Sequence, residues 1–276
     1  MIRIGDIIMR IRELSGYTEK MIKGKRWELL LLCLLPIGGE LLLRSAEAAL
    51  YSLMLYFGTI RPIDLFTGIN TEQAVLSALF ILLRFLIMPP LWCGLGARLM
   101  LFAESKKEPN RLSRYLSSGK FIFRSISANF FVCLISAFFL LPIVAALALG
   151  IYLLSDGAAG AELFVAVNLI ASGIFLGIRW IYLRFGLTAV PFLLLKKGEL
   201  SAFRVVLFTL KFMRHRGKFP LKLMLTYLIP VLIIPPYFIP KIAVSYAVGI
   251  SIFFKEDENA HEQTCIHRSF GKSTAA

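Results

Sequence analysis

Long apolar runs separated by short basic loops constrain this chain more than any other feature. Four of them, at about 27–57, 73–103, 121–153 and 161–195, hold 31 to 35 residues each. A helix needs only about 20 residues to cross the hydrocarbon core of a bilayer. Because 58% of the 276 residues are hydrophobic and 17% are charged, a soluble domain could not bury this much apolar surface. The runs therefore predict helices that use a lipid bilayer as their solvent.

A fifth apolar stretch, at 218–254, is 37 residues long and contains a proline cluster that includes Pro235 and Pro236. Proline interrupts helices, so this stretch predicts two short spans, about 218–235 and 238–254. A re-entrant hairpin is the alternative, and both readings return the chain to the same side. The expected fold is all-α: a polytopic integral membrane bundle of six transmembrane helices over 27–254, with interfacial amphipathic helices.

Proline and glycine also predict local features within the long spans. Pro89 and Pro90 lie in the middle of the second span, where we expect a kink. Gly173 and Gly177 are four residues apart in the fourth span, so they share one helix face and predict close packing of a neighbouring helix.

The two ends of the chain are polar. Residues 1–26 form a basic segment with isoleucine and leucine at helical spacing, which predicts an interfacial helix. Residues 255–276 are polar throughout, and we expect a disordered tail there.

The basic residues indicate the orientation in the membrane. The segments expected on one side carry 23 Lys and Arg residues, and the opposite loops carry two, Arg61 and Lys241. The positive-inside rule then predicts a multi-pass protein of the inner, cytoplasmic membrane with both termini in the cytoplasm. Since the net charge of +14 is spread over these loops, we expect anionic membrane lipids as partners and no nucleic acid.

One loop has an amphipathic pattern of its own. Leu200, Phe203, Leu207 and Leu210 recur at helical spacing, which predicts a helix on the membrane surface, although a gating or coupling helix fits the same pattern. The cations expected to face lipid there and near the first span are Lys23, Lys25, Arg26, Arg204, Lys211 and Arg214.

Charged residues inside the spans are the candidate functional residues. Glu40, Arg44 and Glu47 lie on one helical face of the first span. Glu47 is 10 residues and Arg84 11 residues from the outer ends of their spans, a shared depth of about 15 Å that predicts an ion pair. Glu40 and Arg179 also share a depth.

These charges fit a structural ion network, a polar cavity or substrate path, or the water-facing ends of tilted helices. Arg98, Arg124 and Arg184 lie nearer the span ends, and we expect them to extend toward the headgroups.

No motif predicts catalysis. Glycine-rich phosphate loops, metalloprotease helices and nucleophile elbows are absent, so we expect no enzyme, no catalytic residue and no cofactor. His261, Cys265 and His267 cluster in the tail, but the pattern is too weak to predict a metal site.

Several short motifs carry a family resemblance. They are Met21 to Trp27, Tyr182, Pro191 to Leu193, Ser201 to Phe203, Leu207, Met213, Arg214, Gly217, Lys218, Pro236, Tyr237, Ala243, Ser245 and Tyr246. Their order resembles the uncharacterised bacterial membrane family catalogued as domain of unknown function nine-seventy-five. It is also similar in architecture to the membrane domain of some glycerophosphodiester phosphodiesterases. The resemblance implies six spans and no catalytic residue.

Two functions remain open at this level. The leading hypothesis is a non-enzymatic membrane protein of envelope or lipid homeostasis that moves or shelters a small or lipidic solute. The alternative is a scaffold or accessory subunit that binds a partner protein. A polar cavity beside Arg84 would favour the first, and a packed interior there would favour the second.

Overall fold

A computed structural model describes residues 4–58, 71–104, 118–157, 159–214, 216 and 218–273. Every secondary-structure element in this part of the chain is an α-helix, which confirms the all-α prediction. The elements are α1 (Ile4–Ile22), α2 (Arg26–Tyr56), α3 (Thr71–Ala103), α5 (Gly119–Ser155), α6 (Ala161–Leu187), α7 (Val190–Lys196), α8 (Ala202–Met213), α9 (Lys218–Ile233) and α10 (Pro235–Ser273).

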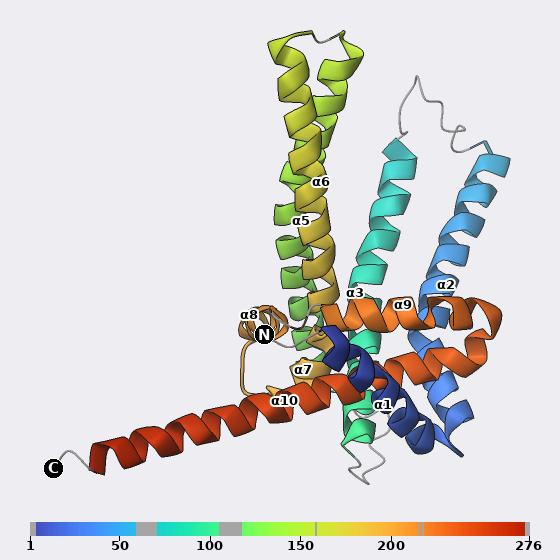
Figure 1. The fold of residues 1–276 in the computed structure, drawn as a ribbon. Coiled ribbons are helices and arrows are strands. Elements are labelled where there is room, and N and C mark those ends of the chain that lie inside the picture. The colour runs from blue at the N-terminus through green and yellow to red at the C-terminus, as the bar shows by residue number, and fades with distance from the viewer. Residues whose placement is uncertain are drawn as a thin grey trace.

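Four long helices, α2, α3, α5 and α6, form the upright part of the molecule (Figure 1). α2 packs on α3, and α5 packs on α6. A Cβ atom placed on Gly173 would lie 2.8 Å from the Leu147 side chain, so this glycine allows the close approach of α5 and α6 that the sequence predicts. Large apolar side chains such as Phe138 and Phe164 are exposed along this pair, as expected for surfaces that face lipid.

The fourth predicted span divides into two helices. α6 ends at Leu187 and α7 begins at Val190. Pro191 explains the break, because its nitrogen cannot donate to the carbonyl of Leu187 and its ring clashes with that carbonyl. The break turns α7 inward, where Leu193 and Leu194 are fully buried.

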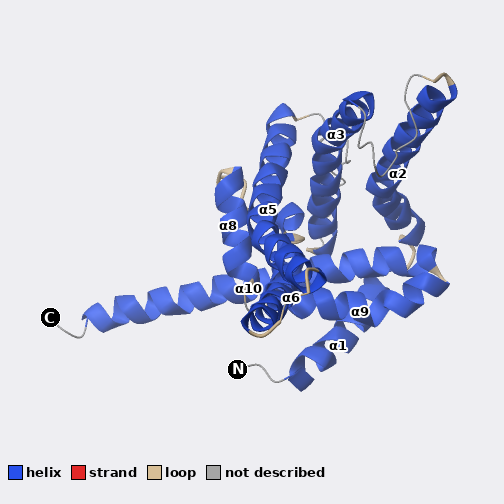
Figure 2. Cartoon of the chain, turned by 90° about the horizontal axis from the view of Figure 1, so that it is seen from above, coloured by secondary structure: helices blue, strands red, loops and turns tan. Residues whose placement is uncertain are grey.

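The last two predicted spans form a hairpin of two helices, α9 and α10. Ile234, next to the proline cluster, lies between the two helices. Figures 1 and 2 both show this hairpin running across the upright helices. Within the described residues, five segments are long and apolar enough to cross a membrane: α2, α3, α5, the α6–α7 segment and Tyr237–Glu256 of α10. α9 has 16 residues, fewer than the roughly 20 that a crossing needs.

The surroundings of α10 show why it is apolar. In its most apolar window 61% of the residues are buried inside the protein, against 11–28% in the other four segments. Near the start of the Tyr237–Glu256 segment, Lys241 contacts Glu19 of α1. Near the end of that segment, Phe254 lies under the ammonium group of Lys196. The predicted outer loop that holds Lys241 therefore lies beside the predicted cytoplasmic N-terminal segment. In the structure, 218–254 forms a helical hairpin that runs across the upright helices.

We call the end of the upright helices at which α1, α8 and the hairpin lie the basic end (Figure 1). The protein core is concentrated there, where fully buried Leu99, Val205, Leu223 and Ile250 belong to one hydrophobic cluster. Of the four helices concerned, only α3 is an upright one. The interior of this protein is thus built mostly by the short and crosswise elements.

The two chain ends compare differently with the sequence predictions. The predicted N-terminal helix is present as α1, and its Leu14 and Ile22 are buried. The tail from 255, expected to be disordered, continues α10 as helix as far as Ser273. The stretch Lys255–Gln263 holds no proline or glycine and consists mostly of residues that tolerate a helix, which explains the difference.

Candidate functional site

The charged residues of the first two spans come together in the structure. Arg84 of α3 forms ion pairs with Glu47 and, at 3.8 Å between Nε and Oε1, with Glu40. Arg44 donates from Nε to Oε1 of Glu40 at 2.8 Å. The side chains of Arg84 and Glu47 are 23% and 26% exposed, whereas Arg44 is 68% exposed. The predicted contact between Glu47 and Arg84 is present, and two cations balance two carboxylates.

Arg179 does not join this cluster, although its depth matches that of Glu40. It is exposed on α6 and its guanidinium lies over the ring of Phe175, 5.1 Å from the centroid. The shared depth of Glu40 and Arg179 does not bring them together, because α6 packs against α5, α8 and α9. Equal depth does not establish which helices are neighbours.

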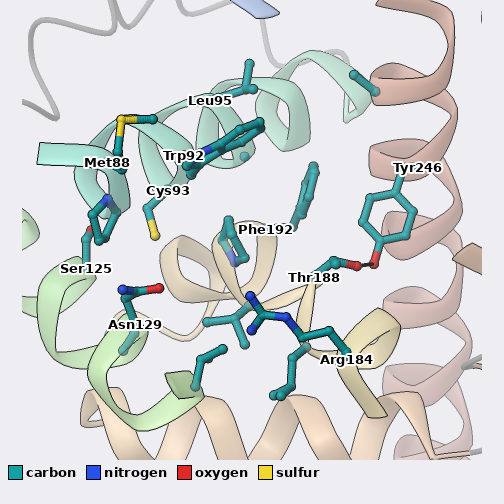
Figure 3. A pocket seen from close by; sticks show the side chains of 18 of the residues that line it. Met88, Trp92, Cys93, Leu95, Ser125, Asn129, Arg184, Thr188, Phe192 and Tyr246 are labelled. Carbon is teal, nitrogen blue, oxygen red and sulfur yellow. Dashed lines mark hydrogen bonds between the residues drawn. The ribbon is translucent and has the colours of Figure 1, made fainter. Parts of the chain in front are cut away.

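A cavity of about 780 Å³ begins beside this cluster and is bounded mainly by α3, α5, α6, α7, α9 and α10 (Figure 3). Glu40 and Arg84 belong to its wall. Most other lining side chains are apolar, among them Phe85, Met88 and Trp92. Ligand-binding pockets typically have volumes of about 300–1,000 Å³, with mostly apolar walls and a few polar groups.

The cavity is elongated along α3. Its lining residues on that helix run from Ile81 to Leu99, 18 residues apart, which corresponds to about 27 Å of helix. This length approaches the roughly 30 Å of a hydrocarbon core.

Proline and glycine shape the cavity wall. Pro89 and Pro90 are buried within α3, and because proline has no N–H they leave the carbonyls of Phe85 and Leu86 without their usual helical donors. A Cβ atom on Gly96 would lie 2.8 Å from the carbonyl carbon of Pro191. The absence of a side chain at Gly96 thus brings α7 against α3 and closes one part of the wall.

Five polar side chains that the sequence did not single out as a site also line the cavity. They are Ser125, Asn129, Arg184, Thr188 and Tyr246, and all are labelled in Figure 3. The hydroxyls of Thr188 and Tyr246 share a hydrogen bond of 2.7 Å, and Arg184 donates to the Ser136 hydroxyl at 3.4 Å. Ser125 and Asn129 are four residues apart on α5, which was the sequence signal for a polar stripe in an apolar helix.

The other two arginines near the span ends also have protein partners. Arg124 donates to the carbonyls of Lys197 and Leu200, and Arg98 forms an ion pair with Glu28 at 3.5 Å. Arg124 thereby satisfies carbonyls in the connection between α7 and α8, rather than only extending toward headgroups.

The basic surface predicted for α8 is present. Arg204, Lys211 and Arg214 are exposed, together with Phe203 and Leu207, while Val205, Val206 and Thr209 are buried against the protein. An outward face that combines cations with exposed apolar side chains is typical of a helix at a membrane surface. Leu200 and Leu210, expected on that apolar face, are half-buried in the core instead.

A polar contact between α1, α2 and α10 was not predicted. Glu19 accepts hydrogen bonds from Lys241 and Tyr237, each at 2.8 Å, and forms an ion pair with Arg26 at 3.3 Å. Arg26, expected to face lipid, therefore contacts protein, whereas Lys23 and Lys25 are exposed. The hydrogen bonds from Lys241 and Tyr237 are the main reason that the pKa of Glu19 is lowered from 4.5.

Among the described residues, no group of three or more His, Cys, Asp and Glu side chains is placed to hold a metal ion. The side chains of His261, Cys265 and His267 lie outside those described. Comparisons with models of protein families, with curated proteins and with solved structures find no match for this chain. The family resemblance stays a prediction, and the cavity must be interpreted from its own chemistry.

Proposed function

We propose that this protein is a non-enzymatic membrane protein that binds a lipidic solute in the cavity and moves or shelters it in lipid homeostasis. The observation that carries the proposal is the long and mainly apolar cavity beside Arg84, within a fold whose upright helices expose large apolar side chains. Such a cavity accommodates a hydrocarbon chain along α3, while its polar groups contact a more polar part of the same molecule.

The proposed location is the cytoplasmic membrane of a bacterium, with both termini in the cytoplasm. The strong bias of Lys and Arg toward one set of loops supports this orientation. The arrangement of the helices is compatible with it, because α1 and α10 contact each other at the basic end. Anionic lipid around the exposed cations of α8 would hold that helix at the cytoplasmic surface.

A cavity-filling substitution tests lipid binding. Met224 of α9 lines the cavity, whereas the adjacent Leu225 does not, and both are exposed at 50% and 61%. We expect Met224→Trp to reduce the lipid that remains bound after purification in a mild detergent, and Leu225→Trp to leave it unchanged. Native mass spectrometry measures the bound lipid. Equal lipid content in the two variants would contradict the proposal, as would a wild-type protein that carries none.

A scaffold or accessory subunit is the second candidate, and α10 favours it in one respect. This helix extends past the rest of the molecule toward Ser273 (Figure 1), which offers a surface for a partner protein. Neutral replacement of Glu40, Glu47 and Arg84 discriminates between the two functions. A transporter should lose lipid movement in reconstituted vesicles while it remains folded, whereas a scaffold should keep its function once its fold survives.

A further inference from the structure

Two polar side chains reach into the cavity from the neighbouring helices α5 and α6. Both Asn129 and Arg184 line it, and Figure 3 shows the guanidinium group of Arg184 and the amide of Asn129 pointing into the cavity. Since α5 and α6 pack together along their length, the two groups belong to the same side of the cavity.

The two arginines of the cavity wall differ in their charge balance. Arg84 forms ion pairs with Glu40 and Glu47, so its charge is neutralised within the protein. Arg184 contacts the neutral hydroxyl of Ser136, and in the part of the chain that the structure describes no carboxylate forms an ion pair with it. Among the described residues, Arg184 is thus a cation of the cavity wall with no carboxylate partner, and it is exposed.

The donors at this place match an acidic group. A guanidinium group offers five N–H donors in a planar fork, and an asparagine amide offers two more. Carboxylate and phosphate oxygens accept such pairs of hydrogen bonds, which are stronger than bonds between neutral groups. An uncharged alcohol or ester could not balance the charge of Arg184.

We propose, building on the proposed function, that the ligand is an amphiphile with an acidic head group, a carboxylate or a phosphate. The head group binds Arg184 and Asn129, and the hydrocarbon chain lies along the wall of α3 beside Met88 and Trp92. The charge of Arg84 is balanced by Glu40 and Glu47, so this cluster does not select the head group.

Trp92 provides a reporter inside the cavity. In a full-length variant with Trp27→Phe and Trp180→Phe, Trp92 is the remaining tryptophan of the three. Bromine atoms quench tryptophan fluorescence on contact, so saturable quenching by a dibrominated chain measures its affinity. The probes are dibromostearic acid, the dibrominated alcohol of equal chain length, and a dibrominated phosphatidic acid. The two acids distinguish a carboxylate ligand from a phosphate ligand.

In this background, Arg184→Gln should weaken the preferred acid about 10- to 100-fold, because it removes charge-assisted hydrogen bonds. It should leave the affinity of the alcohol unchanged. Asn129→Leu should weaken the same acid by a smaller factor. Arg179→Gln is the matched control, since Arg179 lies on the same helix but stacks on Phe175 outside the cavity.

The outcomes separate this inference from the proposed function. Saturable quenching by acids and alcohol alike, with no effect of Arg184→Gln, would overturn the acidic head group while leaving a lipid-binding cavity. Equal losses in Arg184→Gln and Arg179→Gln would also overturn it, since they would indicate a general effect of surface charge. Absence of saturable quenching by every probe would refute the proposed function itself.

Discussion

Reversing the ion pair between Glu47 and Arg84 tests whether the two upright helices α2 and α3 are held in register by charge. Glu47→Arg places two cations in contact, and Arg84→Glu places a third carboxylate beside Glu40 and Glu47. Two unit charges about 4 Å apart interact by about 4 kcal/mol at the effective dielectric constant of a protein surface. Both single variants should therefore fold poorly.

The double variant restores an attractive pair. The free energy of unfolding that it regains, compared with the sum of the two single losses, gives the coupling energy of the two positions. Residues in contact typically couple by about 0.5–3 kcal/mol. We expect about 2 kcal/mol in the middle of this range. The pair is largely buried, which raises the coupling, but the carboxylate introduced by Arg84→Glu still faces Glu40, which reduces the recovery.

Unfolding in mixed micelles of a mild and a denaturing detergent, followed by helical circular dichroism, measures each free energy of unfolding. The matched control is the pair of Glu28 and Arg98, at 3.5 Å, where Glu28 is 69% exposed. An exposed pair of this kind should couple by less than about 1 kcal/mol. If the double reversal at positions 47 and 84 were no better folded than either single variant, the proposed register contact would be refuted.

Other parts of the structure give three further predictions. Gly96→Ala should destabilise the protein by about 1–3 kcal/mol, because the added methyl group meets the backbone of Pro191. Gly38→Ala is the control and should not destabilise it, because no atom lies near the added methyl group there. Thermal unfolding compares the two variants. Folding lowers the pKa of Glu19, so its contribution to stability is present above its unfolded pKa near 4.5 and is lost as the pH falls through the folded pKa. Glu19→Gln should remove this loss of stability in acid. Melting curves recorded at a series of pH values measure it. Serine replacement of the three exposed cations of α8 should lower the anionic fraction of the copurified lipid, because each cation contributes about 1 kcal/mol of attraction to anionic lipid. Lipid mass spectrometry measures this fraction. These cations are Arg204, Lys211 and Arg214.

Hydropathy and proline placement were sufficient to predict most of the helices. The runs at 27–57, 73–103 and 121–153 correspond to α2, α3 and α5 within about two residues at each end. Proline also marked the break between α9 and α10, because it has no N–H to donate within a helix, whereas Pro89 and Pro90 lie inside the continuous helix α3. These features depend only on local backbone chemistry and on transfer of side chains to lipid.

The sequence also predicted the contact between Glu47 and Arg84, since two helices joined by one loop have a fixed relative depth. The same reasoning failed for Arg179, whose helix is not a neighbour of α2. It also missed Arg184 and Asn129, because their importance lies in a cavity that residues of several helices line together.

By itself, the sequence determined that this chain is a helical membrane protein with one strongly basic side, because those properties sum over residues regardless of their partners. Only the tertiary structure decided that the apolar stretch 218–254 lies across the other helices and that a lipid-sized cavity forms beside it. A hydrophobic residue satisfies its chemistry equally against lipid or against protein, so hydropathy alone cannot distinguish a span from a buried hairpin. In the structure, Lys241 contacts Glu19 of α1 and Lys196 of α7 lies over Phe254, so α10 meets other helices of the protein near both of these residues.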